Sequence, residues 1–240
     1  MNINDKIPVI TIDGPSAVGK SALSKVIARK LNWFVLESGI LYRKIALLIL
    51  QKKIPISERY VIPLIKNLNF KKKIINHIHL NAVSEIASKI ANFYEVRKIL
   101  LDQQRAFRIF PGLVAEGRDM GTVVFPDAIV KFFLYANLKS RVHRRILQLK
   151  KNGDHINSQE LYNQIRIRDQ RDRNRLISPL YPSKNAIILD STNMSFSEVI
   201  NISMIYIFER IHKNALYKNI LFNKDYYKKY SQPHFSMKLK

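Results

Sequence analysis

The chain has 240 residues, 47% of them hydrophobic, and a formal net charge of +23. This length and apolar content predict one globular core domain with inserts and exclude a disordered chain. The absence of cysteine excludes disulfides and thiolate metal sites, the first residues lack the form of a signal peptide, and no apolar stretch reaches the ~20 residues of a membrane-spanning helix. We therefore expect a soluble, cytoplasmic protein without a membrane partner.

The positive charge has two interpretations. Clustered Lys and Arg side chains would neutralise the phosphates of a nucleic acid. Alternatively, the chain is enriched in Lys, Ile and Asn throughout, as an A+T-rich genome produces. The lysines are spread along the whole chain, which favours the second interpretation, so we do not expect a nucleic-acid partner.

A phosphate-loop motif follows the first predicted strand, Val9–Ile12. Residues 14–21 read Gly-Pro-Ser-Ala-Val-Gly-Lys-Ser, and an apolar stripe typical of a helix follows. Such a loop points its backbone N–H groups at phosphate oxygens, with Lys20 on the β- and γ-phosphates and Ser21 as a Mg²⁺ ligand. The residues expected to contact the nucleotide are Gly14, Pro15, Ser16, Ala17, Val18, Gly19, Lys20, Ser21 and Ala22.

Four further apolar runs predict strands, at 33–36, 113–115, 130–135 and 186–189. Strands that alternate with helices indicate an α/β fold, here a five-stranded parallel sheet with helices on both faces. The predicted helices span 21–31, 39–50, 82–107, 138–152, 158–175 and 195–213. The last opens with a capping box, Ser195-x-x-Glu198.

Two stretches interrupt the alternation. About 75 residues separate the second and third strands, too many for one crossover, so we expect a mostly helical insert at 51–107. An Arg-dense helical pair lies before the fifth strand, at about 152–182. The core then comprises 1–50 and 108–213. For the basic, aromatic tail, 214–240, a disordered or loosely docked extension is favoured over a nucleic-acid-binding segment.

Polar residues follow the second and third strands, where the ligands of an open α/β sheet bind. Ser38 and Arg43 follow the second strand, and Arg118 and Asp119 follow the third. Arg118 offers a planar fork suited to phosphate, and Asp119 an acceptor for an amino group or hydroxyl. The alternatives are a helix cap with a solvated arginine for the first pair and a local salt bridge for the second.

The segment 168–175, Arg-Asp-Gln-Arg-Asp-Arg-Asn-Arg, is the second strong signal. On a helix, Arg168, Asp172 and Arg175 share one face, and Asp169 can pair with Arg173 on another. A solvated helix with i,i+4 ion pairs is the alternative. Four arginines and no lysine, in a lysine-rich chain, favour bidentate phosphate contact. Together with the phosphate loop, the segment indicates phosphoryl transfer to an acceptor that is itself anionic.

These segments resemble the cytidylate kinases, which are P-loop nucleoside monophosphate kinases. The resemblance covers about residues 7 to 212. Besides the phosphate loop and segment 168–175, it rests on Ser38-Gly39 with Tyr42-Arg43, Arg97, Gln104-Arg105, and Gly117-Arg118-Asp119-Met120-Gly121-Thr122-Val123-Val124-Phe125-Pro126. The last stretch and segment 168–175 are the more specific, since many families share the phosphate loop.

The resemblance implies a P-loop kinase core with a helical lid at about 152–182 that closes over the phosphates. It also implies transfer of the γ-phosphoryl of ATP to CMP or dCMP, with Mg²⁺ as cofactor. It assigns cytosine to Ser88, Arg97 and Asp119, and the sugar to Asp172 with Ser38. It assigns the CMP phosphate to Arg43, Arg118, Arg168 and Arg175. Of these residues, Arg118, Arg168 and Arg175 would be catalytic together with Lys20. We also expect a monomer.

Three departures from the family pattern bear on the affinity and selectivity for CMP. Only Phe70 to His77 fill the place of a small sheet in the insert, His79 stands where arginine is common, and Glu37 where aspartate is usual. Two alternative functions stay open: a P-loop kinase for another monophosphate, such as UMP or AMP, or for a small alcohol, and a nucleic-acid-binding NTPase. A GTPase would need Asn-Lys-x-Asp, a spacing that Asn223-Lys224-Asp225 lacks.

Overall fold

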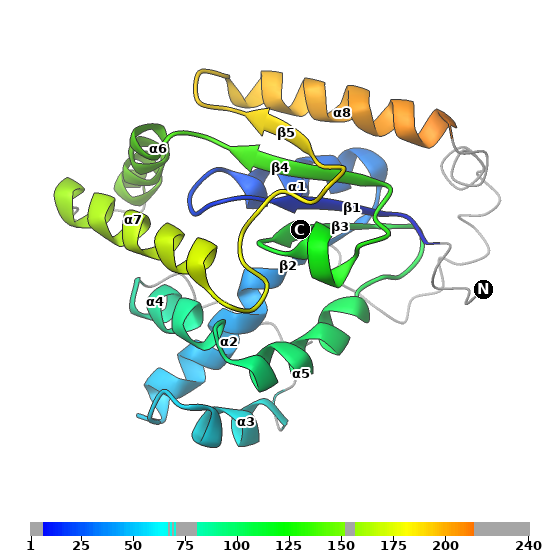
Figure 1. Cartoon of the computed structure of the whole chain (residues 1–240). Coiled ribbons are helices and arrows are strands. Elements are labelled where there is room, and N and C mark those ends of the chain that lie inside the picture. The colour runs from blue at the N-terminus through cyan, green and yellow to red at the C-terminus, as the bar shows by residue number, and fades with distance from the viewer. Residues whose placement is uncertain (1–6, 67, 69, 71–80, 152–156, 214–240) are drawn as a thin grey trace.

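The structure is a computed structural model and describes residues 7–66, 68, 70, 81–151 and 157–213. Its centre is a five-stranded parallel sheet in the order β2-β3-β1-β4-β5 (Figure 1). Each strand lies within two residues of its predicted position, which confirms the predicted α/β fold. The strands are β1 (Val9–Asp13), β2 (Phe34–Glu37), β3 (Leu113–Gly117), β4 (Val130–Tyr135) and β5 (Ile187–Asp190).

Helices cover the sheet from both sides (Figure 1). Helices α1 (Lys20–Leu31) and α8 (Phe196–Lys213) pack on one face, against apolar side chains such as Ile10 and Phe132. Helix α2 (Ser38–Gln51) packs on the other face of β3, against Ala115. Side chains that alternate along each strand thus point into two separate apolar layers, one on each face, as a parallel sheet buried on both faces requires.

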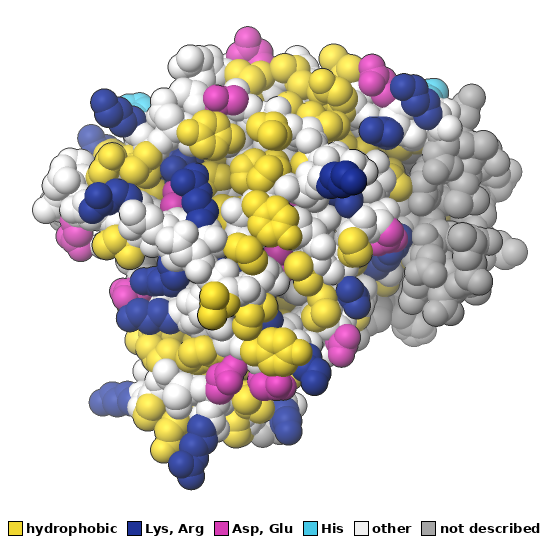
Figure 2. Space-filling model, in the orientation of Figure 1, with side chains coloured by type: hydrophobic (Ala, Val, Ile, Leu, Met, Phe, Trp, Pro, Cys, Tyr) yellow, Lys and Arg dark blue, Asp and Glu magenta, His cyan; other side chains and the backbone are white. Residues whose placement is uncertain are grey.

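The positive charge is not gathered in one patch on the face of the molecule seen in Figure 2. On the face shown in Figure 2, Lys and Arg side chains lie scattered among hydrophobic and acidic ones. No helix in the described part of the chain is long and apolar enough to cross a bilayer.

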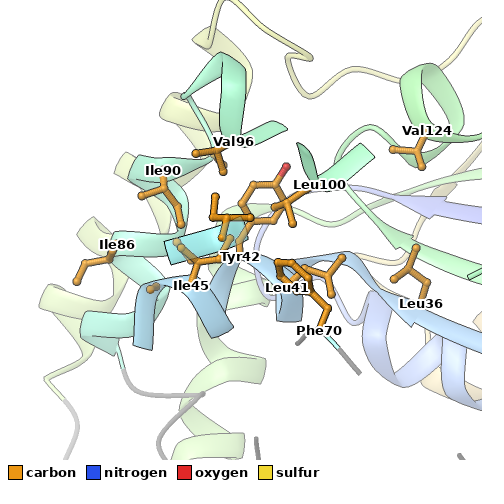
Figure 3. Close-up of a cluster of buried hydrophobic side chains, with 14 of the residues drawn as sticks. Leu36, Leu41, Tyr42, Ile45, Phe70, Ile86, Ile90, Val96, Leu100 and Val124 are labelled. Carbon is orange, nitrogen blue, oxygen red and sulfur yellow. The ribbon is translucent and has the colours of Figure 1, made fainter. Parts of the chain in front are cut away.

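The helices of the insert share one apolar cluster with α2 and the sheet (Figure 3). They are α3 (Glu58–Lys66), α4 (Asn81–Ile90) and α5 (Tyr94–Arg105). Ile90 of α4 and Val96 of α5 are fully buried in this cluster together with Ile45 of α2. The predicted division into core, insert and lid stays a prediction, and His79, residues 71–77, 152–156 and the tail 214–240 lie outside the described residues.

The single helix predicted over 82–107 is wrong, because the chain breaks between α4 and α5. Asn92 N–H donates to the carbonyl of Lys89 at 3.1 Å and Phe93 N–H to that of Ile90 at 3.0 Å, which closes a turn. The backbone N–H of Glu95, in the first turn of α5, donates to Glu58 Oε1 of α3 at 3.1 Å. The break brings apolar residues from both helices into one cluster, and this packing overrides the local helical pattern.

Helices α6 (Leu138–Lys151) and α7 (Ser158–Asn174) pack on each other beside the phosphate loop. Val142, Leu149, Leu161 and Ile165 form their contact, and Ala17 of the loop packs against it. This small cluster is separate from the two layers of the sheet, so α7 reaches the loop as part of a helical pair.

The capping box predicted at the start of α8 is confirmed. Ser195 N–H donates to Glu198 Oε2 at 2.7 Å, and Glu198 N–H donates to Ser195 Oγ at 3.2 Å. The two bonds satisfy N–H groups that a helix start leaves without partners.

Candidate active site

The phosphate loop turns sharply between β1 and α1. Gly14 has a φ of +153°, and a Cβ at this position would lie 2.1 Å from the carbonyl oxygen of Leu134, so only glycine fits. The close approach to β4 directs the chain into the N-terminus of α1. Its free N–H groups and helix dipole favour an anion.

Lys20 lies in the first turn of α1 and is buried. Its Nζ donates to the carbonyl oxygen of Pro15 at 2.8 Å. Burial, and next the positive charge of Arg118, lower the pKa of Lys20 to about 7. The site therefore disfavours the ammonium form until a compensating anion arrives.

Two oxygen ligands suited to Mg²⁺ meet beside Lys20. Ser21 Oγ donates to Glu116 Oε1 at 2.9 Å, and Glu116 is buried at the carboxyl end of β3. Mg²⁺ is commonly held by one or two protein side chains together with substrate phosphates, so this pair fits the ion. Among the described residues, no group of three or more His, Cys, Asp or Glu side chains could hold a metal. The sequence analysis did not single out Glu116, although an acidic residue that ends a buried strand was a usable signal.

Arg118 and Asp119 follow β3 and pair with distant residues rather than with each other. Arg118 Nε donates to Asp172 Oδ2 at 2.6 Å, and Arg118 Nη2 donates to Ser16 Oγ at 2.9 Å. The carboxylate of Asp119 forms a buried ion pair with Arg97 of α5. The local salt bridge considered above is thus not formed, and the pair links β3 to the phosphate loop, α7 and α5.

One side of segment 168–175 is buried toward the site, so the segment is not a fully solvated helix. Asp169, Asp172 and Arg175 are buried, and Arg168 is half-buried. Burial, and next the charge of Arg118, lower the pKa of Arg168 to about 10. Arg168 also lies close enough to Lys20 for its charge to contribute to the low pKa of Lys20, after burial and the charge of Arg118, so positive side chains of the loop and of α7 lie near each other.

The pairing predicted between Asp169 and Arg173 is wrong. Asp169 forms an ion pair with Arg141 of α6, whereas Arg173 is exposed. Arg141 is itself buried, and a buried guanidinium left without a carboxylate would be strongly destabilising. The pair also holds the phosphate loop, because Asp169 Oδ1 accepts from Ser16 N–H at 3.0 Å and Arg141 Nη1 donates to the Ser16 carbonyl at 3.0 Å.

Three arginines present donors that are buried and unpaired. Arg43 Nε, Arg168 Nε and Arg175 Nη2 have no hydrogen-bond partner among the described residues. Burial lowers the pKa of Arg43 and of Arg175 below that of a free guanidinium. Unpaired buried donors are costly, so an anion with several acceptor oxygens would be stabilised here.

Ser38 lies on α2, and of the residues assigned to the base Ser88 lies on α4, Arg97 on α5 and Asp119 just after β3. Ser38 Oγ accepts from Gln104 Nε2 at 2.8 Å, which orients the hydroxyl and which the sequence analysis did not anticipate. The Arg97 guanidinium lies 6.0 Å from the ring centre of Tyr42. Ser88 is buried with an unpaired Oγ, and no hydrogen bond within the described part of the chain joins it to Arg97 or Asp119.

The parallel sheet with a phosphate loop between β1 and α1 defines a P-loop protein of the α/β class. The model of the cytidylate kinase family matches residues 10–209, and the chain belongs to this family. A cytidylate kinase of Buchnera aphidicola subsp. Baizongia pistaciae is 48% identical, over 86% of this chain and 96% of that protein. One of Serratia proteamaculans is 46% identical, over 84% and 95%.

A likeness to solved structures is weaker. A gluconokinase from Sinorhizobium meliloti 1021 aligns over 87% of this chain and 97% of that protein, at 13% identity and a TM-score of 0.45. A likeness at this level supports no argument about function.

Proposed function

We propose that the protein transfers the γ-phosphoryl group of ATP to CMP or dCMP and forms CDP or dCDP. The observation that carries the proposal is the set of buried, unpaired donors on Arg43, Arg168 and Arg175 beside a phosphate loop. A kinase whose acceptor is a nucleoside monophosphate needs two anion sites facing each other, one for the donor and one for the acceptor. The relatives that carry the name cytidylate kinase support the choice of acceptor.

The donor end of the site would be the phosphate loop. Residues 14–22 would surround the triphosphate with backbone N–H groups, and Lys20 would neutralise the transferring phosphoryl group. Ser21 and Glu116 would hold Mg²⁺, which supplies positive charge to the β- and γ-phosphate oxygens when bound. The low pKa of Lys20 supports this role, because a bound polyphosphate restores its charge where it is needed.

The acceptor end would be formed by Arg43, Arg118, Arg168 and Arg175. These guanidinium groups would hold the monophosphate with its oxygen in line for attack, and they would stabilise the negative charge of the transition state. The attacking oxygen already carries charge, so no strong general base is required. The sugar hydroxyls would meet Asp172 and Ser38.

The base would be read by Ser88, Arg97 and Asp119. The exocyclic amine of cytosine donates a hydrogen bond that the Asp119 carboxylate can accept. Uracil has a carbonyl oxygen in that place and would face the carboxylate with unfavourable electrostatics. This difference favours CMP over UMP, the main competing acceptor.

We further propose that helix α7 belongs to a lid that closes over the phosphates and excludes water, which would suppress ATP hydrolysis. The protein would act as a cytoplasmic monomer in pyrimidine nucleotide metabolism, without a nucleic-acid partner. The segment 51–107 would bind the monophosphate.

A coupled assay of the full chain with Mg²⁺, ATP and each of CMP, dCMP, UMP and AMP tests the proposal. We expect CMP or dCMP to give the highest kcat/KM. A higher value with UMP or AMP would assign the protein to another monophosphate. Salt-sensitive RNA binding without turnover of any monophosphate would instead favour a nucleic-acid-binding NTPase.

A further inference from the structure

Asp13, the last residue of β1, uses both oxygens of its carboxylate to hold a distant turn. Its Oδ1 accepts from Met120 N–H at 2.9 Å and its Oδ2 accepts from Gly121 N–H at 2.8 Å. These are the first N–H groups of η2 (Met120–Val124), a single π-helical turn after β3. A helical turn leaves its first N–H groups without partners, so Asp13 of β1 acts as a cap for η2, which follows β3.

The turn lies close against β1 at this point. A Cβ on Gly121 would lie 2.8 Å from Thr11 Oγ1 and 3.4 Å from Asp13 Oδ2. Burial raises the pKa of Asp13 to about 7, and the bonds from Gly121 and Met120 oppose that rise. The residue is only 4% exposed, so these two amides replace the water that would otherwise solvate the carboxylate.

Arg118 and Asp119 lie between two segments that are both bound to Asp13. On one side, Gly117 pairs with Asp13 in the register of β3 and β1. On the other side, Met120 and Gly121 are bound to the Asp13 carboxylate. One residue of a central strand therefore fixes both ends of the dipeptide whose side chains meet Asp172 and Arg97.

We propose that Asp13 is a positioning residue for recognition of the acceptor monophosphate. By capping η2 it holds Asp119 in line with the base and Arg118 in line with the acceptor phosphate, while its own carboxylate contacts neither. The inference rests on the proposed function. It predicts that weakening the cap harms the use of CMP far more than the use of ATP.

Asp13→Asn is the most direct test, because it keeps the size of the side chain and replaces one acceptor oxygen with a donor that faces a backbone N–H. We expect the KM for CMP to rise on the order of tenfold, because Asp119 and Arg118 would no longer be aligned with the acceptor. The KM for ATP should stay within about twofold, and the preference for CMP over UMP should fall. Thr11→Val is the matched control, because it alters the same contact while Thr11 Oγ1 has no hydrogen-bond partner among the described residues.

Two results with Asp13→Asn would overturn the inference. An equal rise of both KM values would assign Asp13 to the phosphate loop, and a lower melting temperature with unchanged kinetic constants would make its role purely structural. If Asp13→Asn does not fold, Gly121→Ala displaces the same turn and should give the same CMP-selective loss. Rapid exchange of the Met120 and Gly121 amide hydrogens in the unaltered protein would equally refute the cap.

The proposed function could be wrong while the positioning role of Asp13 is right, and the experiments distinguish the two cases. If the unaltered protein prefers another monophosphate, Asp13→Asn should raise the KM for that acceptor instead. If no monophosphate is turned over, calorimetric titration with CMP and with ATP gives the same comparison. A loss of affinity confined to CMP would support the positioning role, and equal losses would contradict it.

Discussion

The surroundings of Lys20 disfavour the ammonium form of its side chain. With a pKa of about 7, the buried side chain is mainly neutral at pH 8 before ATP binds. The negative charge of a bound triphosphate favours the ammonium form and raises this pKa, so the complex takes up a proton. We expect calorimetry at pH 8, in buffers of different ionisation enthalpy, to show net proton uptake on ATP binding. In Lys20→Arg the side chain is always charged, so undiminished uptake there would contradict this assignment.

The same residue should be essential for turnover. Lys20→Ala removes the fixed positive charge from the transferring phosphoryl group, and we expect kcat with CMP to fall at least about 100-fold. Initial rates at saturating ATP measure this, with circular dichroism to show that the variant is folded. Near-normal activity would refute the role of the phosphate loop in transfer.

Asp119 should affect one substrate selectively. We expect Asp119→Ala to raise the KM for CMP by at least about tenfold, with a much smaller effect on ATP, because the acceptor for the cytosine amine is lost. Asp127→Ala is the matched control, since Asp127 follows η2 but is half-exposed and pairs with Arg108 at the surface. Steady-state kinetics with each substrate varied in turn give the comparison. Equal effects on both KM values would count against Asp119 as the reader of the base.

Most residues of the candidate site can be identified from the sequence, but their hydrogen-bond and ion-pair partners cannot. The phosphate loop is readable because all its groups lie within one short segment. The partner of Asp169 is not, because Arg141 is 28 positions away and meets it only where α6 packs on α7. The partners of Asp13 and Glu116 are not readable for the same reason, because their hydrogen-bond partners are 107 and 95 positions away.

At the scale of elements, the sheet was predictable and the breaks between helices were not. Short β-branched runs mark buried parallel strands wherever they stand. The end of α4 and the start of α5 depend instead on the contact between Glu95 and Glu58, and η2 depends on Asp13, 107 positions away. Local periodicity contains no signal for either.

The attachment of α7 to the phosphate loop gives a prediction at this scale. Asp169→Ala leaves the buried Arg141 without its carboxylate partner and removes the acceptor of Ser16 N–H. We expect the free energy of unfolding to fall by about 3–5 kcal/mol, as breaking one partner of a buried ion pair does. Urea denaturation measures the free energy of unfolding. Arg173→Gln, at an exposed position on the same helix, is the control and should change this free energy by less than about 0.5 kcal/mol. A loss below about 1 kcal/mol would mean that the pair does not hold the helix.

At the scale of the whole molecule, we expect the activity of the candidate site not to depend on the excess positive charge that gives the chain its net charge of +23. The residues of the site lie between Asp13 and Arg175, whereas the tail after Lys213 adds six lysines and one aspartate. We expect a chain that ends at Lys213 to keep kcat and the KM for CMP within about twofold, because the described side chains that hold the site all come from the retained part. RNA retention in a gel-shift assay at two salt concentrations should be equally weak for both chains. Loss of CMP turnover on truncation would make the tail part of the site, and salt-sensitive RNA binding by the full chain alone would give the excess lysines a polyanion partner.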